Sequence, residues 1–342
     1  MCPAFLFMTD NFQKPFKTID EQIEILKNRN LIIDNEDVAK KTLQSLSYYK
    51  IVNGYQNPFW AKTDYFLNGT SFFDVILFYK FDTLMRNDML NCFLTLETKI
   101  KTIISYEYCK EYGALGYLDK NNYAIKANAT KLDKFMETVE QIKADSIKDL
   151  SNDFQSEHAQ PKYFKYIPVR HYIQKYHNVP LWVMMESLTL GNVSVFYELM
   201  PKKIRVNVAK SISELSQVQY NERDITTILS SMTILRNTCA HGNTIYNFKI
   251  KKNLTDNSFV KIIKNDYPNL NTNNLSLGFI ILASILPNTE VKMMFELVLR
   301  LYNACVQNYP SRVIEKIKHA MGFDLCKLIK VLKNHMPQTM PY

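Results

Sequence analysis

The stretch FDVILFYKFDTLMRNDMLNCFLTLETKIKTIISYEY, residues 73–108, has the clearest helical pattern in the sequence. Its apolar side chains recur at spacings of three and four, which places them on one face of a long helix. The stripe consists of Phe78, Phe81, Met85, Met89, Cys92, Leu96, Ile100 and Ile103. The charged residues Asp82, Arg86, Glu97 and Lys101 fall off this stripe. The stretch therefore predicts one long amphipathic helix.

Further helices are expected on both sides of this stretch. Glycine, proline and capping side chains suggest where they begin and end. The expected ranges are Leu181–Met200, interrupted at Gly191 and ended by Pro201; about Asp224, whose carboxylate could cap the helix, to a stop at Gly242; Leu277–Leu286; Val291–Gln307; and Arg312–Lys333. The charged stretch 121–158 has room for a helix, and β-type residues within 249–274 suggest a small hairpin.

Composition supports a helical protein and disfavours nucleotide-binding folds. The chain has 342 residues but only 8 glycines, against about 24 at average usage. Neither G-x-G-x-x-G nor G-x-x-x-x-G-K-[ST] occurs, so the two glycine-rich phosphate loops are missing. No repeat of 20–50 residues recurs. We expect an all-α protein with an N-terminal helical segment (1–72), a central helical bundle (73–247) and a C-terminal helical domain (270–342).

The net charge and the cysteine pattern indicate the kind of partner and the cellular compartment to expect. Lysine and arginine number 42 against 33 acids, and the formal charge of +9 favours a polyanionic partner. The six cysteines lie far apart with no C-x-x-C, so neither a zinc site nor a disulfide framework is indicated. The apolar N-terminus lacks a basic segment, and the longest apolar run is too short to span a bilayer. We expect a cytoplasmic protein with no membrane partner, metal or cofactor.

The end of the helix near residue 240 carries candidate catalytic residues. At about 100° per residue, Asn237 and His241 lie about 40° apart and nearly opposite the apolar stripe, and Arg236 lies at its edge. Imidazole titrates near neutral pH, so His241 could act as acid or base while Arg236 stabilises charge on a phosphate. The alternative is an exposed histidine that interacts favourably with the negative end of the helix.

An arginine followed by a histidine after four to six residues is a weak pattern alone. It also occurs at Arg170 with His177 and at Arg312 with His319. Arg312 and His319 are seven residues apart and share a face of the expected helix, and no catalytic motif accompanies them, so we expect them on an ordinary solvated face.

Basic and aromatic residues alternate from Lys162 to His177. Lysines can neutralise phosphates while tyrosines stack on bases, the combination that single-stranded RNA favours. The candidate RNA-binding residues are Lys162, Lys165, Arg170, Tyr172 and Lys175. The alternative is an amphipathic segment that packs its aromatic rings in the core. Two lysine groups, 249/251/252 and 327/330/333, are expected to be solvated faces.

The segment Leu235–Gly242 resembles the L-R-N-x-C-A-H signature of abortive-infection proteins of the AbiD/AbiF type, a branch of the HEPN superfamily. Other blocks agree in order. They are Lys14-Pro15, Glu21-Gln22, Tyr48–Tyr55 with Pro58-Phe59, Phe81-Asp82 with Arg86 and Glu97, Pro180–Trp182, and Glu186–Gly191. Together they span most of residues 14–247.

This resemblance implies an HEPN-like helical bundle that forms a homodimer with two facing R-N-x-x-x-H motifs. It implies a metal-independent ribonuclease in which Arg236, Asn237 and His241 are catalytic, acting in phage defence or a toxin–antitoxin pair. A structured noncoding RNA is a further implied partner. Thr244 stands where the family often has an arginine. Alternatives are a non-catalytic RNA-binding or dimerisation module, and an interaction protein for an acidic partner.

Overall fold

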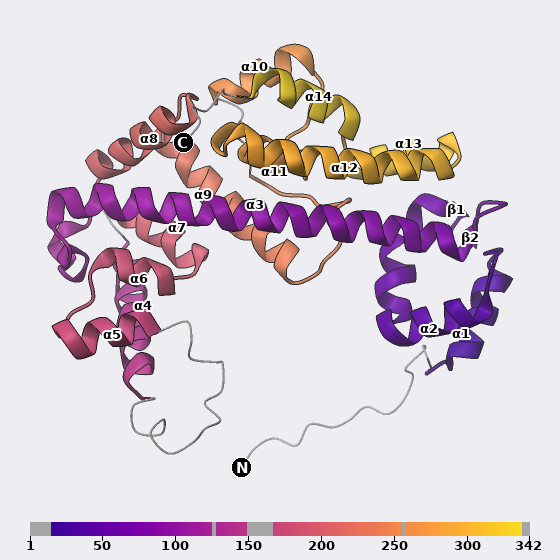
Figure 1. The fold of residues 1–342 in the computed structure, drawn as a ribbon, viewed down its shortest axis with the longest axis horizontal. Coiled ribbons are helices and arrows are strands. Elements are labelled where there is room, and N and C mark those ends of the chain that lie inside the picture. Colours follow the sequence, from indigo (N-terminus) through magenta and orange to yellow (C-terminus); the bar gives the residue numbers. More distant parts are fainter. Residues whose placement is uncertain (1–14, 125–127, 149–166, 253, 255–256, 337–342) are drawn as a thin grey trace. The chain divides into compact units, whose positions relative to one another are not determined.

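The computed structural model describes residues 15–124, 128–148, 167–252, 254 and 257–336. This part of the chain is mostly helical (Figure 1), which confirms the expected all-α class. The chain divides into two compact units, Met1–Phe81 with Tyr302–Ile317, and Asp82–Leu301 with Lys318–Tyr342. The three-part division expected from the sequence stays a prediction.

The first unit contains two short helices, a small hairpin and the beginning of the long helix. Its elements are α1 (Ile19–Asn28), α2 (Glu36–Leu46), the π-helical turn η1 (Tyr49–Asn53), the 3₁₀ turn η2 (Asn57–Phe59), β1 (Trp60–Lys62), β2 (Tyr65–Phe66) and the start of α3 (Phe72–Tyr112). The antiparallel β1–β2 hairpin pairs Trp60 with Phe66. Aromatic rings fill the core, with Phe59 and Tyr309 edge to face at 5.2 Å and Phe78 stacked on Phe81 at 6.1 Å.

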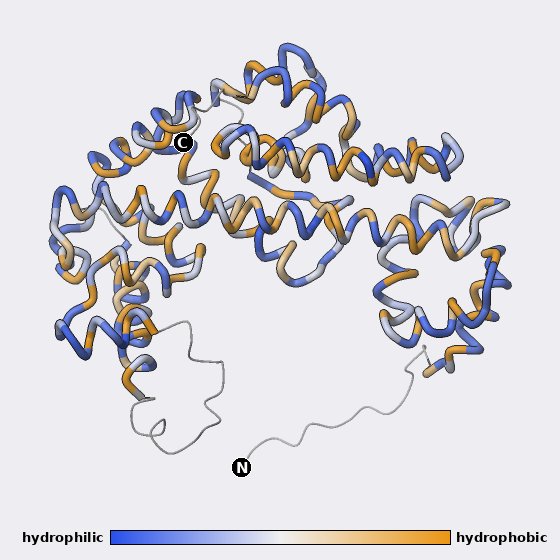
Figure 2. Tube along the Cα trace, in the orientation of Figure 1, coloured by the Kyte–Doolittle hydropathy of each residue, from blue (hydrophilic) through white to orange (hydrophobic). Residues whose placement is uncertain are grey.

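Helix α3 confirms the long helix expected over 73–108. Seven residues of the predicted stripe are buried; Ile103 is half-buried, and Ile104 is fully buried beside it. Polar and apolar residues alternate along the whole helix (Figure 2). The four charged residues off the stripe are buried as well, because other elements pack against more than one face of this helix. Burial of charged groups requires partners, and these partners build the candidate site.

The second unit contains most of the remaining helices. They are η3 (Gly116–Leu118), η4 (Lys120–Asn122), α4 (Ala129–Lys148), α5 (Ile167–Tyr176), α6 (Leu181–Ser187), α7 (Leu190–Leu199), α8 (Lys202–Ser216), α9 (Glu222–Ala240), α10 (Ser258–Asp266), α11 (Ser276–Ile285), α12 (Asn288–Asn308), α13 (Ser311–Met321) and α14 (Leu325–His335). The last residues of α12, from Tyr302 on, and most of α13, up to Ile317, belong to the first unit. No helix of the described residues has the length and hydropathy needed to cross a bilayer.

Helix α11 is buried along its whole length. A Cβ added at Gly278 would lie 2.8 Å from Met89 Cε and 3.4 Å from Leu235 Cδ1. Glycine at this position therefore allows α11 to approach both α3 and α9. This packing anchors the buried side of α9.

The interruption expected in 181–200 lies at another position, and the helix expected to be continuous over 312–333 is divided in two. The break in 181–200 falls at Leu188 and Thr189 rather than at Gly191, because the Thr189 side chain caps α7 by accepting from Asn192 N–H. The stretch 312–333 is divided because Gly322 has φ of +80° and Asp324 caps α14. In both stretches a capping side chain begins a new helix although the apolar spacing continues.

Two smaller expectations were also wrong. Asn221, not Asp224, is the N-cap of α9, and Asp224 completes a capping box as the third helical residue. The stretch 249–274 contains α10 and one antiparallel bridge between Lys249 and Asn274 instead of a hairpin.

Candidate active site at the end of α9

Helix α9 presents the R-N-x-x-x-H residues at its C-terminal end. Leu235 and Cys239 are buried, Asn237 and His241 are exposed, and Arg236 is half-buried between these two faces. The helix ends at Ala240, and His241 is its C-cap. The next residue, Gly242, has φ of +69°, a conformation that terminates the helix and favours glycine. The helix therefore turns the candidate amide and imidazole toward solvent, as the sequence predicts.

A chain of polar contacts holds Arg236. Its Nη1 donates a hydrogen bond to Asn237 Oδ1 at 3.3 Å, and its Nε lies 3.5 Å from Glu97 Oε2 on α3, an ion pair without hydrogen-bond geometry. Glu97 also pairs with Lys101 at 2.8 Å. Lys101 Nζ in turn donates to the Leu188 carbonyl between α6 and α7 at 2.9 Å. The Glu97–Lys101 pair thus links the Arg236 guanidinium to α3 and to the backbone between α6 and α7.

A second buried pair holds the backbone that follows His241. Asp82 Oδ1 accepts hydrogen bonds from the N–H groups of Tyr246 at 2.7 Å and Ile245 at 3.2 Å. Arg86 lies 3.4 Å from Asp82 and donates to the Asn243 carbonyl at 3.1 Å. This Asp82–Arg86 clamp fixes residues 243–246 against α3. Because the clamped segment begins two residues after His241, it restricts where the imidazole can lie.

The cysteine within the motif is a structural residue. Burial raises the pKa of the Cys239 thiol to about 12, with a smaller contribution from Asp82 that Arg86 opposes. A thiol with this pKa stays protonated at neutral pH and is a poor nucleophile. Thr244, in the place of the family's frequent arginine, is half-buried within the clamped segment.

The candidate RNA-binding residues are only partly described. Lys162 and Lys165 lie outside the described residues. Arg170 on α5 is half-buried, and its Nε donates to the Ser146 carbonyl of α4 at 3.0 Å. Tyr172 is half-buried and Lys175 is exposed.

Three rings on α5 lie together at the surface rather than in the core. The Tyr172 and Tyr176 ring centres are 5.2 Å apart, His171 is 5.8 Å from Tyr172, and Lys175 Nζ is 5.2 Å from the centre of the Tyr176 ring. Tyr176 is 53% exposed. The described part of this segment is therefore available to a ligand.

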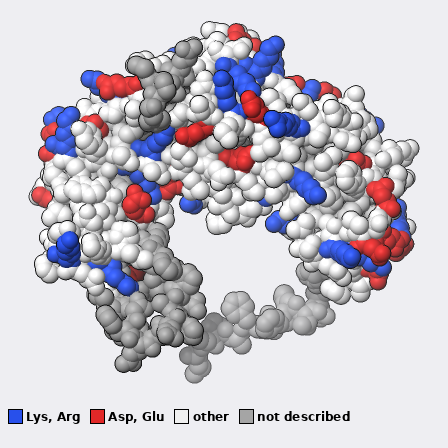
Figure 3. Space-filling view, in the orientation of Figure 1, with Lys and Arg blue, Asp and Glu red and all other residues white. Residues whose placement is uncertain are grey.

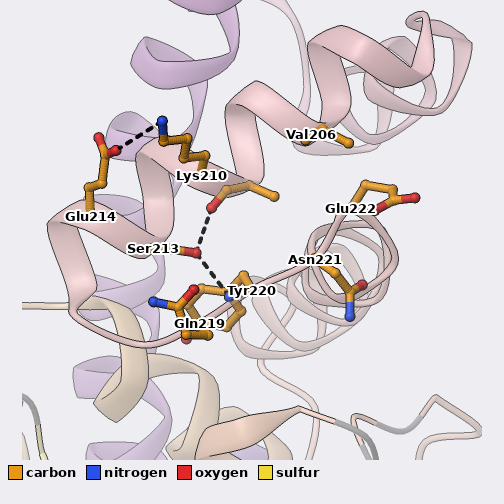
Figure 4. A pocket seen from close by; sticks show the side chains of 9 residues that line it. Val206, Lys210, Ser213, Glu214, Gln219, Tyr220, Asn221 and Glu222 are labelled. Carbon is orange, nitrogen blue, oxygen red and sulfur yellow. Dashed lines mark hydrogen bonds and ion pairs between the residues drawn. The ribbon is translucent and has the colours of Figure 1, made fainter.

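A pocket of about 480 Å³ lies between α8 and the start of α9 (Figure 4). Its polar groups are used within the protein: Ser213 Oγ donates to the Ala209 carbonyl and accepts from Tyr220 N–H, and Lys210 is 3.8 Å from Glu214. The pocket and the R-N-x-x-x-H residues are at opposite ends of α9, roughly 28 Å apart at 1.5 Å per residue. It is therefore separate from the candidate site. No three His, Cys, Asp or Glu side chains of the described residues form a metal-binding group.

The sequence pattern does not identify the structural partners of the motif. It places Asp82, Arg86 and Glu97 in the family blocks without a function, and Lys101 only off the apolar stripe. The spacing of four residues in both the Asp82–Arg86 and Glu97–Lys101 pairs is typical of ion pairs on one helix, and this signal could have found them.

One known protein family matches the region of the chain that contains the candidate site. The profile of the Abi_2 family, described as Abi-like protein, matches residues 41–247, which is more than half of the chain and includes the clamp, the Glu97–Lys101 pair and the motif on α9. Searches of curated proteins and of solved structures found no match. The chain is therefore a member of the Abi-like protein family, of the AbiD/AbiF type.

Proposed function

We propose that this Abi-like protein is a metal-independent endoribonuclease of the HEPN type that acts as a toxin in phage abortive infection or in a toxin–antitoxin pair. The observation that carries the proposal is the geometry at the end of α9. A guanidinium anchored by Glu97 and Asn237 lies on the same helix end as an exposed His241. In phosphodiester cleavage an imidazole can act as general acid or base, and a guanidinium can stabilise the charge that develops on the phosphate.

In the proposed reaction a ribose 2′-OH attacks the adjacent phosphate and the 5′-oxygen of the next nucleotide leaves. His241 acts as general base toward the 2′-OH or as general acid toward the leaving oxygen. Arg236 stabilises the negative charge on the phosphorane, and Asn237 orients the guanidinium through the 3.3 Å hydrogen bond. No cofactor takes part in these steps.

We further propose that the active form is a homodimer and that RNA is both substrate and regulator. Facing R-N-x-x-x-H motifs would supply the second set of charged groups that one α9 helix lacks. The rings and Lys175 of α5 would hold single-stranded RNA by stacking and charge. A structured noncoding RNA is the proposed inhibitor of the toxin.

Incubation of the purified chain with total RNA in EDTA tests the proposed activity. We expect cleavage to continue in EDTA, with products that end in a 2′,3′-cyclic phosphate. No cleavage by a folded chain, or cleavage that EDTA abolishes, would contradict the proposal.

One contact favours a second candidate function, a non-catalytic RNA-binding or dimerisation module. Glu97 already neutralises part of the charge on Arg236, as expected if the arginine only attaches α9 to α3. In that case the purified chain binds RNA, and the RNA stays intact in the same assay.

A further inference from the structure

The C-terminal part of the chain carries most of the net charge. Residues 248–342 contain 13 lysine and arginine residues against 6 acids, a net charge of +7, whereas residues 1–247 contain 29 against 27. The excess positive charge therefore lies beyond the region that matches the family profile. Such an asymmetry within one chain favours a polyanionic partner for the basic part.

Eight lysines of this part lie on the stretch after α9, on α10 and on α14. Six are exposed and two, at 264 and 333, are half-buried. We call them the C-terminal lysine surface: Lys249, Lys251, Lys252, Lys261, Lys264, Lys327, Lys330 and Lys333. Figure 3 shows lysine and arginine side chains gathered over α10 and α14.

Specific contacts hold these segments together. Asp324 N–H, at the start of α14, donates to the hydroxyl of Tyr267, which follows α10, at 2.9 Å. Lys327 Nζ lies 4.4 Å from the centre of the same Tyr267 ring. Lys249 Nζ donates to the Ala320 carbonyl, near the end of α13, at 3.3 Å. The lysines therefore belong to one packed region rather than to separate tails.

In the part of the chain that the structure describes, the lysines of this surface lack acidic partners. Among the described residues, none of the eight lysines forms an ion pair with a carboxylate. The two described acids beside them have other partners: Asp324 is 3.1 Å from Lys318, and Asp266 is 2.7 Å from His335.

Lysines on α8 show the contrasting arrangement. Lys202, Lys203 and Lys210 are exposed, and each lies within 3.8 Å of a glutamate, namely Glu222, Glu111 and Glu214 respectively. The lysines of the C-terminal lysine surface thus lack the acidic partners that the α8 lysines have, which favours a polyanion as their ligand.

We propose that the C-terminal lysine surface binds double-stranded RNA through its phosphates, independently of sequence. Its composition distinguishes it from a protein interface, where arginine and aromatic residues are enriched and lysine is depleted: residues 237–299 and 313–342 contain no arginine. An amphipathic helix that lies in a membrane surface presents an apolar face as well as basic residues. Of the described residues of α10 and α14, Ile262 is the one large apolar side chain that is exposed.

The choice of a duplex over a single strand follows from the aromatic residues. Proteins that bind single strands stack bases on exposed rings, whereas duplex RNA is recognised by shape and by contacts to phosphates and 2′-OH groups. Tyr267 is half-buried, with Lys327 Nζ 4.4 Å from the centre of its ring, and it therefore offers less ring surface for stacking than Tyr176 on α5, which is 53% exposed. The choice of RNA over DNA rests on the proposed function, but the surface lies outside the ribonuclease site and its binding does not depend on cleavage.

Binding of a short, fluorescently labelled 2′-O-methyl RNA duplex to the full-length chain tests the proposal. This probe has no free 2′-OH, so binding is measured whether or not the chain cleaves RNA. The triple variant Lys327→Gln, Lys330→Gln, Lys333→Gln should bind at least about tenfold more weakly in anisotropy titrations. Its log–log salt dependence should be shallower by about 2 to 3, because each phosphate contact contributes roughly 0.7–0.9 to the slope.

The α8 triple variant Lys202→Gln, Lys203→Gln, Lys210→Gln removes the same formal charge and serves as the matched control. We expect less than about a twofold change, because these lysines already have acidic partners. Arginine at the three α14 positions should restore binding. Equal losses in the two triple variants, or an equal loss of affinity for single-stranded 2′-O-methyl RNA, would overturn the proposal.

A second variant of the same surface guards against misfolding of the first. Lys251→Gln, Lys252→Gln, Lys261→Gln leaves α14 intact and should also weaken duplex binding while the melting temperature stays unchanged. Unchanged duplex affinity in this folded variant contradicts a continuous binding surface.

Discussion

At the scale of single residues, His241 is the most direct test of the proposed chemistry. Its side chain is exposed at the C-cap of α9, so His241→Ala should remove cleavage and toxicity while the melting temperature stays within a few degrees of the parent. His319→Ala on α13 is the matched control, since this histidine is also exposed and has no proposed function. Full activity of a folded His241→Ala chain on total RNA would show that this histidine is not catalytic.

Asp82 should matter for stability and for the position of His241. Its carboxylate is fully buried and accepts two backbone N–H groups while it faces Arg86. Asp82→Asn leaves Arg86 without its buried counter-ion, and we expect a loss of about 3 kcal/mol in the free energy of unfolding, measured by urea denaturation.

Asp88, about two turns further along α3, is the control residue for the stability measurement on Asp82. Burial raises the pKa of its carboxyl, and its Oδ2 has no hydrogen-bond partner among the described residues. Asp88→Asn should therefore leave stability unchanged or raise it. If both substitutions cost the same free energy, the clamp is not what stabilises the segment after His241.

At the scale of elements, the exposed face of α5 allows a test of single-strand binding. Tyr176→Ala should weaken binding of single-stranded RNA by about 1–3 kcal/mol, the usual loss for one stacked base. Lys175→Ala should reduce the log–log salt slope by about 0.7. Tyr106 is also an exposed tyrosine, on α3, and Tyr106→Ala should have no effect. Equal losses at both tyrosines would remove α5 from the proposed RNA site.

Some helices can be predicted from the sequence more accurately than others. Helix α3 follows from hydrophobic periodicity because its apolar stripe repeats without interruption. The helical stretch 181–200 is divided by the capping side chain of Thr189, and the stretch 312–333 by the left-handed backbone of Gly322. Hydrophobic periodicity contains no information on caps or on backbone angles. Element types were therefore easier to predict than their ends.

At the scale of the whole molecule, the candidate site could be predicted only in part. The exposure of Asn237 and His241 follows from the helical wheel of α9 alone. The contacts of Asp82 with Tyr246 and of Glu97 with Arg236 join residues more than 130 positions apart. A single sequence gives their spacing along α3 but not the packing of α3 against α9, so their function became visible only in the structure.

The proposed homodimer makes the last prediction. On one helix Arg236 and His241 are about 140° apart, and Arg236 is turned toward Glu97, so we expect each site to combine Arg236 of one subunit with His241 of the other. Arg236→Ala and His241→Ala chains should each be inactive alone. When the two variant chains are unfolded and refolded together, random pairing should make about half of the dimers mixed. Each mixed dimer has one intact site and one site that lacks both residues, so the mixture should show about a quarter of the parent activity. Sedimentation and mass analysis establish whether the refolded dimers are mixed. If mixed dimers stay inactive, then either Arg236 and His241 of the same chain form one site or this pair is not catalytic.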